Sequence, residues 1–423
     1  MKNVIKMSLA TAIMMTAGAV SAQAADGIKI FDDLKFKGEL RPRYQYTDRE
    51  ASTASAGSTL TNRTNLNINA GLLGVDGLRA TVELNSVNDF GTLDQTTHQT
   101  AAEAAVAKVS QANIEYSDDG VKATLGRKTL NLDNQRFIGS VGWKQNFQTL
   151  DLASVSYKNE SFNAIAAYVY GVNAIGDDGN GNESLVYGGG VTSGTTKSAI
   201  INASYKIAAP IKLTAYGYLL GSVSNTYGIA ATGKIAASEG MKFKYRAEYA
   251  MQTDPSFETK SKGKPTNVDS TYINLDLGAN FSGILAGINY EVLSANKNYA
   301  TTGGPALQTN LATKHKFNGW ADLFLKTPAQ GLKDLNLMVG YKAKGFGVAK
   351  VIYHDFKSDE DSIDYGTELD LIYKNKLPGF QNVAGMLKAG FYSAGDTVAQ
   401  GNNAGQAKDV SKIWAMLDYK FSI

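Results

Sequence analysis

The chain has 423 residues, among them 43 glycines, 7 prolines and no cysteine, and its formal net charge is +3. The absence of cysteine excludes disulfides and cysteine-ligated metals, and the near-neutral charge gives no electrostatic reason to expect a nucleic-acid partner. Beyond the N-terminal segment no run reaches the ~18 apolar residues of a membrane-spanning helix.

The N-terminal segment has the layout of a secretory signal peptide. Two lysines form a basic start, an apolar run covers 7–20, and Ala22–Ala24 is a small-x-small cleavage pattern. We therefore expect residues 1–24 to be removed and residues 25–423 to form a single exported domain. Loss of the two lysines lowers the formal net charge from +3 to +1.

The next three stretches alternate apolar and polar residues, as strands with two unlike faces do. They cover 35–47, 61–72 and 78–86. Their polar faces are rich in arginine, namely Arg41, Arg43, Arg63 and Arg79. Pro42 has no N–H to donate to a strand ladder, so we expect a β-bulge at that position.

The alternation is clearest in residues 241–252. Every second residue from Met241 to Met251 is apolar or aromatic, whereas the residues between them are mostly charged or polar and include Arg246. The segment is therefore predicted to be a strand with one apolar face and one charged face.

Short turns and longer connections succeed each other along the whole chain. The eight short turns fall at 75–77, 117–120, 158–161, 208–211, 237–240, 280–283, 342–345 and 375–379. With nine longer loops between them, they predict eighteen strands, sixteen being the alternative, and place both termini on the short-turn side.

This pattern is typical of an all-β, transmembrane antiparallel β-barrel with short periplasmic turns and long extracellular loops. A sheet in lipid must close, because every backbone polar group needs a partner. The stretch Lys412–Ile423 also resembles the C-terminal assembly signal of outer-membrane proteins. We therefore expect a bacterial outer-membrane protein, inserted by the barrel-assembly machinery through this stretch and surrounded by lipid and lipopolysaccharide. A soluble all-β fold is the alternative, which the signal peptide disfavours.

The alternation also predicts which charges face the lumen. Arginines dominate the early part of the chain, with Arg127 at the end of a strand, whereas inward acidic residues such as Glu368 and Asp370 come later. An arginine-rich wall and an acid-rich wall would focus charged solutes. The alternative is that these charges only solvate a wet lumen.

Two loop segments are too apolar for external loops, and we expect one of them to fold inward and narrow the pore. Residues 131–146 combine Asp133, Arg136 and Lys144 with large apolar side chains, and residues 314–328 are the second candidate. Packing over the barrel rim is the alternative for the first segment.

Segments 132–146, 315–332, 351–356 and 365–371 resemble the alginate-export family of outer-membrane porins. The resemblance implies an eighteen-stranded barrel. The named member of that family passes an anionic uronate polymer through an arginine-rich constriction, which the cluster here resembles in character. That cluster is Arg41, Arg43, Arg63, Arg79, Arg127 and Arg136.

The expected function is a water-filled porin for passive diffusion of small hydrophilic solutes and ions. The alternative is a channel selective for an anionic saccharide, such as alginate or an oligouronate, or for organic acids. Alginate-export relatives suggest a monomer, whereas general porins are often trimers.

We expect neither catalysis nor a cofactor. Catalysis by a nucleophile needs a positioned histidine, and no nucleophile motif accompanies His98, His315 or His354. Asp178–Asn182 begins an incomplete calcium-loop pattern, so an incidental loop Ca²⁺ is the alternative to no metal.

Overall fold

The computed structural model describes residues 30–50, 55–90, 105–175, 183–185, 191–193, 195–257, 267–302, 304–396 and 408–423. The expected signal peptide, the calcium-like loop at 178–182 and His98 lie outside these residues. Within them, no helix is long and apolar enough to cross a membrane.

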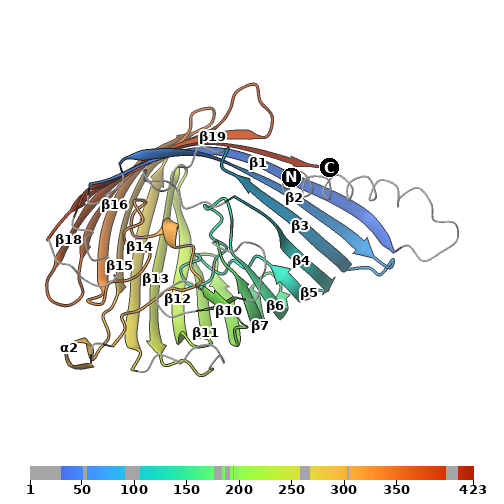
Figure 1. The fold of residues 1–423 in the computed structure, drawn as a ribbon, viewed down its shortest axis with the longest axis horizontal. Helices are drawn as coiled ribbons and strands as arrows, with labels where there is room; N and C mark the ends of the chain where they lie inside the picture. The colour runs from blue at the N-terminus through green and yellow to red at the C-terminus, as the bar shows by residue number, and fades with distance from the viewer. Residues whose placement is uncertain are drawn as a thin grey trace.

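Eighteen long strands form one antiparallel sheet that closes on itself, because β1 pairs with both β2 and β20 (Figure 1). The first seven are β1 (Phe31–Arg49), β2 (Gly57–Leu72), β3 (Leu78–Asn88), β4 (Val106–Asp118), β5 (Val121–Lys128), β6 (Thr149–Lys158) and β7 (Phe162–Asn173). The next six are β10 (Ser198–Ala208), β11 (Ile211–Leu220), β12 (Ser224–Ser238), β13 (Met241–Thr253), β14 (Asp269–Phe281) and β15 (Ile284–Leu293). The last five are β16 (Leu332–Ala343), β17 (Gly347–Lys357), β18 (Asp364–Lys376), β19 (Val383–Ala394) and β20 (Val410–Ser422). A short hairpin, β8 (Glu183–Leu185) and β9 (Val191–Ser193), extends from β7 in a loop.

The predicted strand number and the predicted short turns are confirmed. All eight turns lie at one end of the barrel, and β1 begins and β20 ends there as well. The N–H of Ile423 donates to the carbonyl of Phe36 at 2.9 Å, so the two ends of the barrel chain are neighbours. Since periplasmic turns are short in this class of barrel, this end is the periplasmic one.

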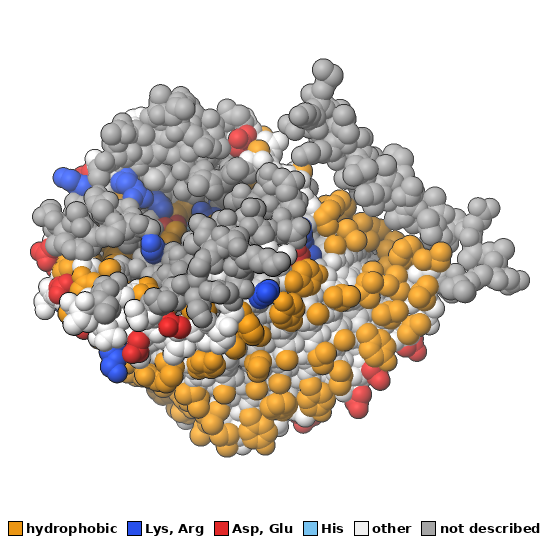
Figure 2. Space-filling view, turned by 60° about the horizontal axis from the view of Figure 1, so that its bottom comes forward, with side chains coloured by type: hydrophobic (Ala, Val, Ile, Leu, Met, Phe, Trp, Pro, Cys, Tyr) orange, Lys and Arg blue, Asp and Glu red, His pale blue; other side chains and the backbone are white. Residues whose placement is uncertain are grey.

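The outer surface carries the apolar face of the strands (Figure 2). On β13, Phe243, Tyr249 and Met251 are 37%, 45% and 43% exposed, whereas Arg246 and Glu248 between them are buried in the interior. The strands thus present apolar side chains to lipid and polar side chains to the lumen, as predicted.

The expected bulge at Pro42 is wrong. The register of β1 against β2 runs without a shift from Arg41 to Arg43, and the ladder with β20 only lacks pairs at positions 41 and 42. β1 stays regular at Pro42 because its pairing with β2 continues through this position, and only the ladder with β20 is interrupted. The irregularity of β1 lies instead between Asp32 and Lys35.

Two loop segments enter the interior of the barrel. Inward segment A (129–148) joins β5 to β6, and inward segment B (304–331) is the later part of the connection from β15 to β16 and contains the 3-10 turn η1 (Lys314–Lys316). The short helix α2 (Tyr299–Thr302) of the same connection lies beyond the ends of the strands (Figure 1). Ile138 and Leu311 form a parallel bridge between the two segments, and both side chains are buried. The N–H of Gly139 donates to the carbonyl of Leu311 at 2.8 Å. Both candidate segments therefore fold inward and pack on each other.

Candidate functional site

On one side of the lumen, inward segment A packs against an aromatic part of the barrel wall. The ring of Phe137 lies 5.5 Å from that of Tyr216, 6.2 Å from Tyr218 and 5.2 Å from Tyr272. All four rings are buried. Burying an aromatic side chain in such a cluster stabilises the docked segment by hydrophobic transfer and by ring packing.

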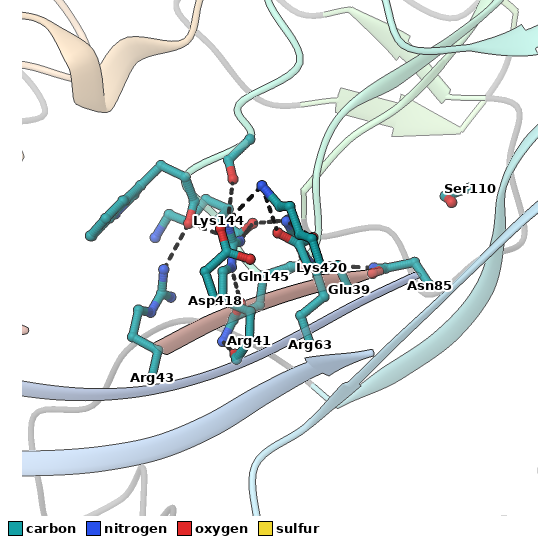
Figure 3. Close-up of polar contacts among 12 residues, drawn as sticks. Glu39, Arg41, Arg43, Arg63, Asn85, Ser110, Lys144, Gln145, Asp418 and Lys420 are labelled. Carbon is teal, nitrogen blue, oxygen red and sulfur yellow. Dashed lines mark hydrogen bonds and ion pairs between the residues drawn. The ribbon is translucent and has the colours of Figure 1, made fainter. Parts of the chain in front are cut away.

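On the other side of the lumen, inward segment A is held by arginines of β1 and β2 (Figure 3). Arg41 donates to the carbonyls of Gly142 at 3.0 Å and Lys144 at 2.8 Å, and to the side-chain oxygen of Gln145 at 3.0 Å. Arg43 donates to the carbonyl of Trp143 at 2.7 Å. The segment therefore turns its backbone acceptors toward the guanidinium groups.

Arg63 completes this attachment. It donates to the carbonyl of Lys144 at 3.2 Å and forms an ion pair with Glu39, which lies beside Asp418 (Figure 3). Buried guanidinium groups need such partners, because an unpaired buried charge costs several kcal/mol. We call Arg41, Arg43 and Arg63 the arginine clamp.

Charges within inward segment A reach the wall opposite the arginine clamp. Asp133 accepts from Arg246 of β13 at 2.5 Å, and Arg136 donates to Glu291 of β15 at 3.0 Å. The side chains of Arg136 and Glu291 are 2% and 3% exposed, so this ion pair is fully buried. The segment thus spans the lumen, since β13 and β15 lie eight and six strands from β1 around the eighteen-stranded barrel.

Inward segment B is bound to the acidic wall. The N–H of Ala321 donates to Glu368 of β18 at 2.7 Å, and Asn318 donates to Asp334 of β16 at 3.1 Å. The ring of His354 joins two of these strands to each other, with Nδ1 2.9 Å from Asp334 and Nε2 3.6 Å from Asp370.

The two inward segments and the wall meet around Lys388 of β19. Its ammonium lies 3.8 Å from the ring centre of Trp320, 4.2 Å from Trp143 and 5.5 Å from Trp414. These are all three tryptophans of the chain. Cation–π contacts in a desolvated place are worth about 2 kcal/mol or more, so this group fixes the position of both segments.

His315 of η1 lies in the same group. Its Nε2 is 2.7 Å from the Lys388 ammonium, which can only donate, and its Nδ1 is 2.6 Å from Asp322. This arrangement assigns the proton of a neutral ring to Nδ1. Burial lowers the pKa of His315 to about 3, and the charge of Lys388 opposes protonation as well, against the attraction of Asp322.

The structure brings together eight of the eleven residues proposed from the sequence to line the pore. Those that lie in or against the inward segments are Arg41, Arg43, Arg63, Asp133, Arg136, Lys144, Arg246 and Glu368. Asp370 faces the lumen beside them, but its contact is with His354 of the wall. Arg79 and Arg127 bind elsewhere. Arg79 pairs with Asp33 at 2.7 Å, and Arg127 forms a two-pronged pair with Asp151 at 2.8 and 3.1 Å.

Sequence reasoning missed Lys388 and Glu39. Both lie on the inward faces of strands whose alternation is clear, so the pattern already placed them in the lumen. Their partners, however, come from loops far along the chain, and alternation says nothing about loop conformation.

Comparison with known proteins agrees with this architecture. A family model described as alginate export matches residues 32–263, and no curated protein matches the chain. Acinetobacter baumannii OccAB2 superposes with a TM-score of 0.71 at 14% identity, over 93% of this chain and 99% of that one. Pseudomonas aeruginosa OccK2 (OpdF), solved in complex with glucuronate, gives 0.70 at 12% identity, over 93% and 99%. At such low identity these structures establish the shared barrel fold.

Proposed function

The chain belongs to the alginate export family, and from this premise we propose how its barrel, an outer-membrane channel of the porin type, limits what passes. In this proposal the two inward segments form the constriction, and small hydrophilic solutes diffuse past them through water. The observation that supports it is the attachment of inward segment A to two facing walls, by Phe137 on one side and the arginine clamp on the other. A segment fixed on both sides of the lumen sets a constant size limit.

A channel for an anionic saccharide or an organic acid is the second candidate function. The alginate export description of the family favours it, as does the similarity to OccK2, whose solved structure contains glucuronate. In this case too the constriction selects by size, and charges on the lumen wall select by sign.

The surroundings of the channel follow from the same proposal. The apolar outer band contacts membrane lipid and lipopolysaccharide, and the barrel-assembly machinery recognises β20 (Val410–Ser422). One barrel encloses one passage, so a monomer suffices for function, and a trimer is the alternative. Neither a catalytic step nor a cofactor has a part in passive diffusion.

The experiment is single-channel recording in planar bilayers, on the native protein and on the double variant Arg41→Ser/Arg43→Ser. The native protein is expected to give small, steady current steps. The variant is expected to give larger and noisier steps, because inward segment A loses its attachment to β1. The matched control is Arg127→Ser, an arginine bound to its strand neighbour Asp151, which leaves the step size unchanged.

Two results would contradict the proposal. Absence of current from barrels that are demonstrably folded would mean a plugged barrel. Equal step sizes in the native protein and the clamp variant would mean that inward segment A does not set the passage.

A further inference from the structure

Eight lysines line the inner face of the barrel near its periplasmic end, on strands between β10 and β18. They are Lys206, Lys212, Lys234, Lys242, Lys244, Lys342, Lys350 and Lys374. We call them the lysine arc. Each follows the inward alternation of its strand; Lys242 and Lys244, for example, flank the outward Phe243, which is 37% exposed.

Like charges face each other directly within the arc. Lys206 is the cross-strand partner of Lys212, and Lys234 is the partner of Lys244. Lys350 is also repelled by the charges of Lys244 and Lys342. Opposed like charges destabilise a sheet, so folding alone gives no reason for this arrangement.

The inner wall provides almost no counter-charge for the arc. Asp276 pairs with Lys244 at 3.0 Å, and it is the one acidic residue at an inward position in the periplasmic half of the described strands β10–β18. Lys206, Lys234, Lys242 and Lys342 are exposed. This differs from the arginine clamp, whose guanidinium groups are buried against carbonyls and Glu39.

Glycines leave room for the lysine side chains. A Cβ added at Gly278 would collide with the side chain of Lys244, and one added at Gly340 would lie 3.0 Å from Cγ of Lys350. Both lysine stems therefore lie over strand positions that carry no side chain.

We propose that the lysine arc recruits anions, carboxylate-bearing solutes above all, and that it rather than the arginine clamp sets the ion preference of the channel. The inference rests on the proposed function, since it needs an open passage. Unpaired ammonium groups raise the local concentration of anions at a charged mouth. Because this charge lies at one end of the barrel, the current is expected to differ between the two voltage polarities.

The absence of native cysteine allows a test on the folded, inserted channel. The variant Lys342→Cys/Lys350→Cys is recorded across a KCl gradient before and after reaction with a cationic or an anionic thiol reagent. Before reaction the chloride-to-potassium permeability ratio is expected to fall about twofold or more at 0.1 M salt, where the screening length is about 10 Å. The cationic reagent is expected to restore the native ratio, and the anionic reagent to lower it further.

The matched control is Lys357→Cys, on the same strand as Lys350 but at its other end and paired with Asp355 at 3.2 Å. Its permeability ratio is expected to equal that of the native channel with either reagent. Current that flows with an unchanged ratio in the double variant would overturn the role of the arc and leave the channel proposal standing. No current from folded native barrels would overturn both.

Discussion

The arginine clamp and the lysine arc carry charge of the same sign on the inner wall, but the clamp is buried and hydrogen-bonded, whereas most of the arc is exposed. Arg41 is 5% exposed and donates to four acceptors of inward segment A. Lys342 is exposed at the periplasmic end. A charge that is already hydrogen-bonded to the protein holds structure together, whereas a charge that faces water produces a field in the lumen. Counting basic residues on a pore wall therefore does not reveal which of them a solute meets.

The largest expected effect comes from breaking the clamp. Arg41→Ala removes the Arg41 donor from the carbonyls of Gly142 and Lys144 and from the side-chain oxygen of Gln145, and only Arg63 still donates to Lys144. Leaving a buried acceptor without its donor costs on the order of 1–3 kcal/mol. We expect faster proteolytic cleavage within 129–148 and a lower thermal midpoint in detergent. Arg79→Ala, whose Asp33 partner is exposed, is the control, and equal cleavage rates in both variants would contradict the assignment.

A smaller effect is expected from acid, through His315. Its pKa is lowered to about 3 from 6.5, so between these values the unfolded chain binds a proton that the folded protein does not. Stability therefore falls as the pH falls through this window, by at most about 1.4 kcal/mol per pH unit. Thermal midpoints from pH 7 to 4 check this, and His315→Gln is expected to show a shallower decline than the native protein. If the thermal midpoint falls equally steeply with pH in both proteins, His315 does not contribute to the loss of stability in acid.

The smallest effect on stability is expected from the lysine arc. Lys342→Gln/Lys374→Gln removes two exposed charges on either side of β17, both at positions paired with Val348 and the first of them repelling Lys350. Exposed substitutions usually change stability by less than about 0.5 kcal/mol, and relief of repulsion acts in the stabilising direction. Urea or thermal unfolding of the variant is therefore expected to match the native protein, while its ion preference changes. A marked loss of stability would show that these lysines have a structural partner.

The fold could be predicted from the sequence because it depends on local, periodic information. Side chains alternate along a strand whatever the rest of the chain does, so residues 241–252 showed their two faces directly. The eight turns needed only local signals as well. Pro42 is the exception, since a missing N–H predicts a defect only when the neighbouring strand needs that donor.

The candidate site was only partly predictable, because it is formed by loops. The composition of residues 131–146 predicted that they fold inward, but the contact between Arg41 and Gln145 joins residues 104 positions apart. Alternation predicted that Arg41 faces the lumen, but it could not show that carbonyls of inward segment A accept its hydrogen bonds. The lysines of the arc were visible as polar positions, and only the register of neighbouring strands gathers them at one end.

The seam between β1 and β20 joins the parts of the barrel that are farthest apart along the chain. Closing so long a loop is entropically slow compared with pairing neighbouring hairpins. During folding, the curled sheet therefore exposes two unpaired edges until Phe36 and Ile423 meet. This seam is where another copy or a chaperone would pair with the unfinished sheet. Cross-linking β1 to β20 during folding would report when the barrel closes.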